Sequence, residues 1–358
     1  MQHIRVSPCF AAAVLVLLLS AFPLAAQTPI SVYGVWHCYT DGCSWASVPN
    51  MTTFDTENRW LIDRNVDGTY HPSVNVVVLS FVQPVKLMNL TNDSGDSNGI
   101  PIGMNSAVVN YFQSKGVRVM FSIGGASYRR DWDSALSTNP TQLGINAANA
   151  AKQFNVGMEI DYESSKSNLT GLQSFVTAYR SVIPYDPTGQ NYAARLTIDL
   201  GDGDTYLTSL ANYATTNWLK TSAPVLDYAN AMVGSQKTGL STLEGGWQQH
   251  VDGDGTAVPP LAPAKLTGSL WLIGGQPNCD NFSNSDQNTA ASFVENLAPQ
   301  GAGTTTGMLG YMFWAAGCQG NGTGCTFPPN TCQLGMAERR QLSTFQFQWG
   351  LCASNNGR

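Results

Sequence analysis

Short apolar runs recur along the chain, separated by polar loops or by segments with the spacing of an amphipathic helix. The run 74–82 is almost continuously apolar and rich in β-branched residues, which is typical of a strand buried on both faces. In 169–182 the apolar residues instead recur with helical spacing. The predicted strands cover 30–39, 74–82, 117–123, 154–163, 192–200, 226–233, 266–274 and 307–314. The predicted helices cover 104–113, 141–154, 169–182, 206–219, 288–297 and 337–345.

Strands and helices therefore alternate along the chain. This alternation indicates a parallel sheet, and eight strand–helix units in 358 residues indicate an α/β fold of the closed (β/α)8 TIM-barrel class. The main competitor is an open, doubly wound sheet. It is disfavoured because no glycine-rich phosphate-binding turn follows the first strand. The stretch 237–263 is rich in Gly, Asp and Pro and is predicted to be a loop insertion rather than a domain boundary.

The predicted strand 154–163 differs from the others because acidic residues alternate with apolar ones. Its acidic positions are Glu159, Asp161 and Glu163, and its apolar positions are Met158, Ile160 and Tyr162. Successive side chains of a strand point to opposite faces, so the three carboxyl groups share one side at a spacing of roughly 6–7 Å. A solvated edge strand can show the same alternation, but strongly apolar flanking strands place these acids inside the sheet. Crowded carboxyl groups cannot all ionise freely, and a protonated acid held in this way can serve catalysis.

The first 26 residues have the layout of a secretory signal peptide. Arg5 precedes an apolar run at 10–19 that is too short to span a bilayer, and the small residues Ala25 and Ala26 mark the expected cleavage point. We therefore expect residues 27–358 to form one exported barrel domain, secreted or, in a bacterium, periplasmic. No later segment has the length and apolar character of a membrane span, so no membrane association is expected after cleavage.

The composition narrows the ligand class. Only 12% of the residues are charged, the net charge is −6, and no Lys/Arg cluster forms a basic face, which argues against nucleic-acid binding. The 35 glycines, with many Asn, Ser and Thr residues, predict long polar loops that suit an uncharged, hydroxyl-rich ligand. The histidines lack metal-site spacing, and 252–255 lack the later ligands of a calcium loop, so no metal or other cofactor is expected. No G-x-S-x-G motif supports a serine esterase.

Seven of the eight cysteines follow the expected cleavage point. In an exported protein their default state is a disulfide rather than a metal ligand. The candidate pairs are Cys38 with Cys43, Cys325 with Cys332, and Cys279 with Cys318. Cys352 would then be left without a partner, so this pairing scheme stays open.

Three motifs, in order along the chain, resemble those of glycoside hydrolase family 18. Ser122-Ile123-Gly124-Gly125 matches the family's S-x-G-G at the end of the third barrel strand. The stretch 156–163 matches the D-G-x-D-x-D-x-E signature of the fourth strand imperfectly, and 310–314 matches the eighth-strand pattern that ends in a tryptophan, here Trp314. The family holds chitinases, endo-β-N-acetylglucosaminidases and several non-catalytic relatives. The resemblance covers nearly the whole chain after the signal peptide.

The resemblance implies a role for each matching residue. Glu163 is the expected general acid/base in a reaction that the substrate assists: its N-acetyl carbonyl attacks its own anomeric carbon and forms an oxazolinium ion. Asp161 would hold the acetamido N–H and offset the developing positive charge. Glu159 would stand where the family has an aspartate that shares a proton with the next one. Trp314 would form the floor under the sugar, although core packing is an equal alternative on sequence alone.

Several further positions are predicted to contact the substrate. Ser122, Gly124 and Gly125 belong to this set, although a tight turn with close backbone packing is the alternative for them. On the sixth strand, Met232 matches the methionine of a family pattern that continues to a tyrosine. The remaining sugar-binding candidates, each with core or surface packing as the alternative, are Trp36, Tyr128, Trp132 and Trp271.

Three departures from the family pattern bear on activity. The first aspartate of the signature is Val156, and the second is Glu159, which is one methylene longer and could still pair with Asp161 after repacking. More serious, Gly234 stands where the family has the tyrosine that donates to the attacking acetamido oxygen. A residue from another strand, such as Asp199, or Tyr228 in a shifted register, would be needed to compensate.

The sequence thus predicts a secreted, monomeric glycosidase that uses no cofactor. Its partner would be an oligo- or polysaccharide containing N-acetylglucosamine, cleaved at β-1,4 bonds, as in chitin, peptidoglycan-like glycans or N-glycan cores. The alternative is a non-catalytic barrel that binds carbohydrate or protein. Gly234 and Val156 support that alternative, whereas the presence of both Asp161 and Glu163 favours the enzyme.

Overall fold

The computed structural model describes residues 32–39, 43–63, 68–70, 72–201, 208–232, 240–271, 284–300 and 307–316. Eight parallel strands close into a barrel in the order β1-β10-β9-β8-β7-β6-β5-β2. The barrel strands are β1 (Val32–His37), β2 (Val76–Val82), β5 (Arg118–Gly124), β6 (Gly157–Asp161), β7 (Leu196–Leu200), β8 (Ala229–Ala231), β9 (Leu266–Trp271) and β10 (Gly310–Ala316). The predicted eight-stranded barrel is confirmed, with every strand in its predicted place along the chain.

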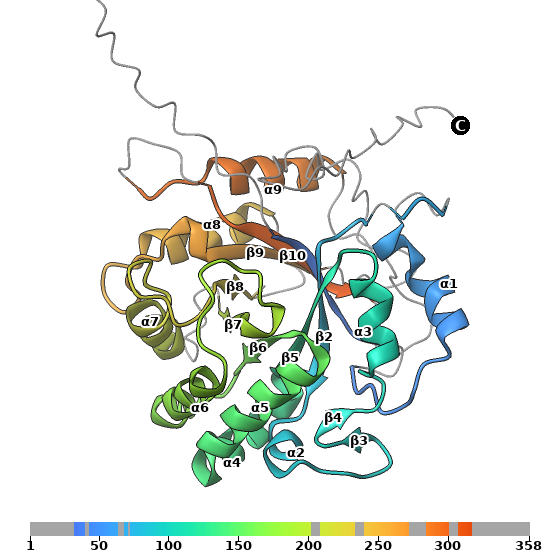
Figure 1. Cartoon of the computed structure of the whole chain (residues 1–358). Coiled ribbons are helices and arrows are strands. Elements are labelled where there is room, and N and C mark those ends of the chain that lie inside the picture. The colour runs from blue at the N-terminus through green and yellow to red at the C-terminus, as the bar shows by residue number, and fades with distance from the viewer. Residues whose placement is uncertain are drawn as a thin grey trace, which may run out of the picture.

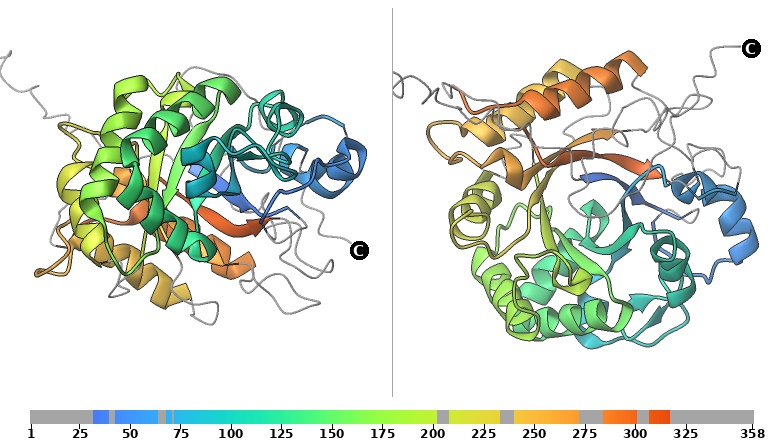
Figure 2. Two further views of the ribbon diagram at one scale, coloured as in Figure 1. Left: turned by 90° about the horizontal axis from the view of Figure 1, so that it is seen from below. Right: turned by 45° about the horizontal axis from the view of Figure 1, so that its top comes forward.

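Helices lie around the outside of the strands in all views (Figures 1 and 2). They are α1 (Met51–Ile62), α2 (Pro84–Asn89), α3 (Ser106–Gln113), α4 (Arg129–Thr138), α5 (Pro140–Phe154), α6 (Leu169–Val182), α7 (Thr208–Asn217), α8 (Leu240–Asp252) and α9 (Asn284–Asn296). A two-stranded hairpin of β3 (Asp96–Ser97) and β4 (Ile100–Pro101) follows α2. Single 3₁₀ turns occupy Ala126–Tyr128, Tyr192–Ala194 and Pro263–Lys265.

One sequence prediction about this outer layer is wrong. The stretch 237–263, predicted to be a loop, contains α8. Its buried residues Leu243, Trp247, His250 and Val251 follow helical spacing and pack inward. The surrounding Gly, Asp and Pro residues obscured that pattern, and the true loop begins at Gly253. Helices α1, α2 and α4 were not predicted, and the predicted helix 337–345 lies outside the described residues.

The barrel strands carry two separate apolar layers, because their side chains alternate between the outer helices and the barrel interior. The outer layer packs strand residues such as Met158 and Ile160 against the helices. The inner layer is a smaller cluster made of Val32, Trp36, Val76, Val78, Met120, Tyr228 and Met312. Val156, which replaces the first aspartate of the family signature, belongs to the outer layer, so this departure leaves the barrel interior unchanged.

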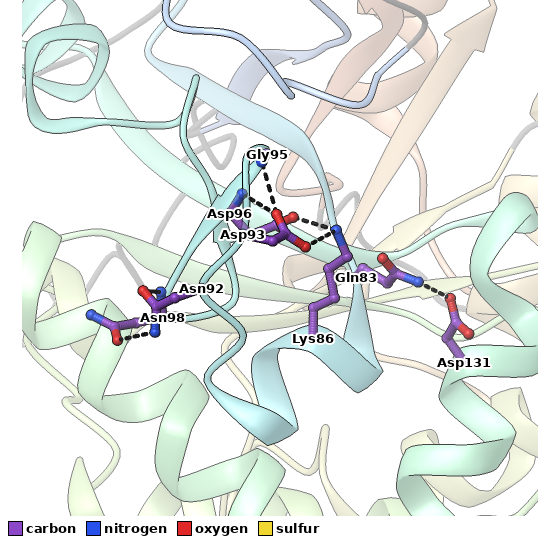
Figure 3. A network of polar contacts seen from close by, with 8 residues as sticks. All are labelled: Gln83, Lys86, Asn92, Asp93, Gly95, Asp96, Asn98 and Asp131. Carbon is purple, nitrogen blue, oxygen red and sulfur yellow. Dashed lines mark hydrogen bonds and ion pairs between the residues drawn. The ribbon is translucent and has the colours of Figure 1, made fainter.

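A charged network fixes the segment that follows β2 (Figure 3). Lys86 of α2 forms ion pairs with Asp96 and, at 3.1 Å, with Asp93, so the hairpin is held against the helix. Gln83 donates a hydrogen bond of 2.6 Å to Asp131 of α4. This bond ties the end of β2 to the neighbouring helix and fixes the chain as it leaves the barrel.

The predicted disulfide between Cys38 and Cys43 is present just after β1. It packs against Ala315 and the ring of Phe81 beside the last barrel strand. The other cysteines of the predicted pairs lie outside the described residues, as does the predicted signal peptide. Among the helices that the structure describes, none combines the length and apolar character of a membrane span.

Candidate active site

The acidic residues of β6 point into the barrel, as the alternation predicts. Glu159 is fully buried and Asp161 is 5% exposed, whereas Glu163, two residues beyond the strand, is only partly buried. In barrels of this class, active sites lie at the carboxyl ends of the strands. The three carboxyl groups therefore lead from the barrel interior towards that end, with Glu163 the outermost.

Glu159 is held from both sides by neutral donors. The indole Nε1–H of Trp36 donates to Oε1 at 2.8 Å, and the amide Nδ2 of Asn230 donates to Oε2 at 2.6 Å. The hydroxyl of Thr267 in turn donates to Oδ1 of Asn230 at 2.5 Å and fixes that amide. Burial raises the pKa of Glu159 to about 7, against the opposing effect of these hydrogen bonds.

The raised pKa of Glu159 predicts a pH-dependent stability. The folded protein holds a proton that the unfolded chain, with an ordinary value of 4.5, loses as the pH rises towards about 7. The free energy of unfolding should therefore fall by about 3 kcal/mol across this interval, at 1.4 kcal/mol per pKa unit. Urea denaturation of the wild type at the two ends of the interval measures the change, and Glu159→Gln should reduce it. A stability that rises from the acid to the neutral end would contradict the assignment.

Asp161 is coupled to Glu163. Burial, the charges of Glu163 and Glu159, and a hydrogen bond with Glu163 all raise the pKa of Asp161 well above its ordinary value. Ionisation of Asp161 is therefore disfavoured next to Glu163. Atom Oδ1 of Asp161 is buried and finds no hydrogen-bond partner among the described residues. A buried acceptor of this kind is suited to receive an N–H from a ligand.

Trp314 and Phe81 form a partly exposed aromatic surface near the carboxyl ends of β10 and β2. Their rings stack at a centroid distance of 5.6 Å, and Trp314 also contacts Trp36 at 6.4 Å. Trp36 itself is 4% exposed and its indole N–H is committed to Glu159, so it offers a sugar almost no surface. Phe81 was not predicted, because at the end of an apolar strand it is indistinguishable from a core residue.

The other aromatic candidates differ in their environment. Trp132 is fully buried, and its indole N–H donates to the carbonyls of Ile123 and Asp161. The prediction that it lines a sugar site is therefore wrong, and Trp132 is instead a core residue that supports the end of β6. Tyr128 is partly exposed in the turn after β5, and the side chain of Trp271 lies outside the described part of the chain.

Gly124 and Gly125 contribute to the site by allowing close packing, and not by taking part in a reaction. A Cβ on Gly124 would lie 2.1 Å from the carbonyl oxygen of Asp161 and from Nε1 of Trp132, and a Cβ on Gly125 would lie 2.7 Å from the Phe81 ring. Both residues also have positive φ, at 117° and 81°. The two glycines allow β6 and the aromatic surface to approach the turn after β5, which accords with the tight-turn alternative.

We expect Gly124→Ala to lower the free energy of unfolding by about 4 kcal/mol, because overpacking adds to backbone strain. Gly116→Ala is the matched control: Gly116 also has a positive φ of 80°, but a Cβ there meets nothing within 4 Å. The control should cost only about 1 to 2 kcal/mol, from backbone strain alone. Chemical denaturation measures both variants. Equal losses would show that the close approach to Asp161 does not matter.

The remaining predicted site residues lie at different depths. Ser122 is fully buried in the barrel opposite Glu159, so any role it has is to position that residue. Met232 follows β8, is half-buried and packs against the outer apolar layer. Gly234, which stands where the family has its tyrosine, lies outside the described residues. Tyr228, a proposed substitute, lies in the inner apolar cluster two residues before Asn230, and its hydroxyl contacts the Met120 sulfur at 4.0 Å.

One further residue of the barrel interior is as relevant to the site as the predicted residues. Asp199 of β7 is 3% exposed and pairs in register with Asn230. Burial and the charges of Glu159 and Asp161 raise its pKa well above the ordinary value. Within the described residues, no group of three or more His, Cys, Asp or Glu side chains could hold a metal ion.

Comparison with known proteins bears on the fold. No protein-family model matches the chain, and no curated protein matches it. A chitinase of glycoside hydrolase family 18 from Pseudoalteromonas aurantia matches the structure with a TM-score of 0.52 at 14% identity, over 80% of this chain and 94% of that one. A chitinase from Rhizomucor miehei matches with a TM-score of 0.51 at 12% identity, over 84% and 97%. A chitinase from Bacillus thuringiensis matches with a TM-score of 0.50 at 9% identity, over 85% and 69%. The chain therefore has a closed eight-stranded barrel fold like that of family 18 chitinases.

Proposed function

We propose that this protein is a glycosidase of the family 18 type, which cleaves β-1,4 bonds next to N-acetylglucosamine. The observation that carries the proposal is the contact between Asp161 and Glu163 at the carboxyl end of β6, with one buried oxygen of Asp161 lacking a partner. A reaction in which an acetamido group takes part needs a proton donor and an acceptor for the acetamido N–H. A carboxyl pair that shares a proton and has one oxygen without a partner can supply both. The fold, shared with several chitinases, supports the same class of activity.

In the proposed reaction Glu163 first acts as an acid. It donates its proton to the glycosidic oxygen, and the bond between that oxygen and the anomeric carbon breaks as the substrate's acetamido oxygen bonds to the same carbon. Asp161 accepts the acetamido N–H and offsets the positive charge of the resulting oxazolinium ion. Glu163, now ionised, takes a proton from water as the water attacks the anomeric carbon and reopens the ring. Two displacements at one carbon retain its configuration.

The aromatic surface supplies the binding contact in this proposal. Trp314 and Phe81 are both partly exposed and lie stacked near the carboxyl ends of β10 and β2, and their ring faces can pack against the C–H face of a sugar. The ring of Trp36 contacts that of Trp314 at 6.4 Å, and its indole N–H, which donates to Glu159, links this surface to β6. A sugar on Trp314 would therefore lie at the same end of the barrel as the carboxyl groups of Asp161 and Glu163.

The expected signal peptide indicates where the protein acts. We propose that residues 1–26 direct export and that residues 27–358 act as one monomeric domain on an extracellular or periplasmic glycan. The neutral polar composition suits such a substrate, since an uncharged glycan needs hydrogen bonds and aromatic contacts rather than a charged surface.

A panel of glycans tests the proposal. Purified protein is incubated with N-acetylglucosamine oligomers, chitin, peptidoglycan and N-glycan cores, and newly formed reducing ends are measured. Cellotetraose, which has the same linkage and no acetamido group, is the control and should not be cleaved. Release from at least one acetamido glycan is expected, whereas release from cellotetraose at the same rate would contradict the proposed participation of the acetamido group.

The alternative, a carbohydrate-binding barrel without activity, has one observation in its favour. Among the described residues of β8 and its flanks, the one tyrosine, Tyr228, lies deep in the barrel and cannot reach an acetamido oxygen at the mouth. Tight binding of an N-acetylglucosamine oligomer without any release of reducing ends would establish this alternative.

A further inference from the structure

Beneath the reacting pair lies a second pair of carboxyl groups on adjacent strands. Glu159 of β6 and Asp199 of β7 are 0% and 3% exposed, their strands pair directly, and a hydrogen bond between the two side chains contributes to the raised pKa of Asp199. The extra methylene of Glu159, compared with the aspartate of the family signature, lets its carboxyl group extend to Asn230 of β8, the register neighbour of Asp199. The carboxyl group of Glu159 therefore lies beside Asp199.

No cation neutralises this pair in the part of the chain that the structure describes. The ion pairs there involve Arg59, Lys86, Lys166 and Arg180, and none of them reaches Glu159 or Asp199. Glu159 instead accepts hydrogen bonds from the neutral donors Trp36 and Asn230. Two buried carboxyl groups in contact, without a cation, cannot both ionise.

We propose that Glu159 and Asp199 share one proton, which makes Asp199 a positioning residue that holds Glu159 away from Asp161. The resemblance to family 18 implies instead that Glu159 would share a proton with Asp161. Above about pH 7 the site then contains two carboxyl pairs, Asp161 with Glu163 above and Glu159 with Asp199 below, each holding one proton. Only the kinetic consequence of this inference rests on the proposed function.

The surroundings of Asp199 agree with a shared proton. Among the residues that the structure describes, the charged groups that act on it are Glu159 and Asp161, both on β6, while β8 faces it with the neutral amide of Asn230. Burial and these two negative charges raise the pKa of Asp199 well above its ordinary value. Because the lower pair keeps its proton, the charge beneath Asp161 stays constant while Glu163 gives up and regains a proton during the reaction.

Proton release on unfolding tests the inference without reference to activity. Unfolding of the wild type at about pH 7.5, above the pKa of Glu159, should release the shared proton, and calorimetry in buffers of different ionisation enthalpy counts it. Asp199→Asn and Glu159→Gln should each release one proton fewer. The double variant should lose no more than either single variant, because both remove the same proton.

Thr197→Val is the matched control. Thr197 is a buried lumen residue on the same strand, its hydroxyl finds no partner among the described residues, and valine has the same shape. Its proton release should equal that of the wild type. Two results would contradict a shared proton. One is that Asp199→Asn releases as many protons on unfolding as the wild type. The other is that the double variant loses as many protons as the two single variants together.

A kinetic comparison tests the positioning role. In Asp199→Asn the amide can still donate to Glu159, so kcat on an acetamido glycan should stay within about threefold of the wild type. Asp199→Val offers no donor and should lower kcat by about ten- to a hundredfold with little change in KM. Equal kcat in both variants would overturn the positioning role, whatever the proton count shows. If the wild type cleaves no glycan, the proposed function fails, and proton release still decides whether the carboxyl pair exists.

Discussion

Replacement of Glu163 with glutamine is expected to lower kcat for an N-acetylglucosamine oligomer by about a thousandfold or more. Glutamine has the shape of glutamic acid but carries no transferable proton, so it can neither protonate the leaving oxygen nor activate water. Affinity for the oligomer should stay close to that of the wild type, because the aromatic surface of Trp314 and Phe81 is untouched. Reducing-end assays and titration calorimetry measure the two effects separately.

The matched control for this variant is Glu57→Gln. Glu57 lies on α1, outside the barrel, and the chemical change is the same. Its kcat should equal that of the wild type. If Glu163→Gln retains wild-type turnover, or if wild type and variant both show only background turnover while binding the oligomer, Glu163 is not a general acid and the binding barrel is the better description.

Replacement of Asp161 with alanine is expected to lower kcat by roughly a hundred- to a thousandfold, the usual cost of one group that stabilises developing charge. The variant removes both the acceptor for the acetamido N–H and the negative charge that offsets the oxazolinium ion. It also removes the carboxyl group that forms a hydrogen bond with Glu163. The pH range in which Glu163 acts as an acid should therefore shift downwards, since its proton is no longer held by two groups.

Asp161→Asn separates the two contributions of Asp161. Its amide oxygen can still accept the acetamido N–H but carries no charge, so an intermediate kcat is expected. Asp131→Asn, on the outer helix α4, is the control: the amide oxygen can still accept the hydrogen bond from Gln83, so turnover should stay unchanged. Steady-state kinetics over a range of pH measure all three variants. A loss confined to KM in Asp161→Ala would show that Asp161 binds substrate without acting on the transition state.

The barrel and its acidic strand were predictable because they depend on local periodicity. Eight apolar runs in alternation with helical segments leave few folds other than a closed barrel, and the period of two in a strand places Glu159 and Asp161 on one face. Helix α8 was missed because its glycines, Gly245 and Gly246, belong to a segment whose overall composition resembles a loop.

The contacts between strands could not be predicted from one sequence. The hydrogen bonds of Glu159 to Trp36 and Asn230 join residues 123 and 71 positions apart, and they depend on the register of β1, β6 and β8. Composition alone cannot distinguish a buried indole that holds a carboxylate from one that stacks on a sugar. For the same reason Trp36 was assigned to substrate binding, and the link between Glu159 and Asp199 was not expected.

The stereochemistry of the first product tests the central claim most directly. Proton NMR of the wild type acting on an N-acetylglucosamine tetramer follows the anomeric signals from the first minutes, before the product equilibrates in water. Participation of the acetamido group, with Glu163 as acid and then base, predicts that the β-anomer forms first and the α-anomer appears later. Initial formation of the α-anomer would mean that water attacks the substrate directly, and would contradict the roles given to Asp161 and Glu163.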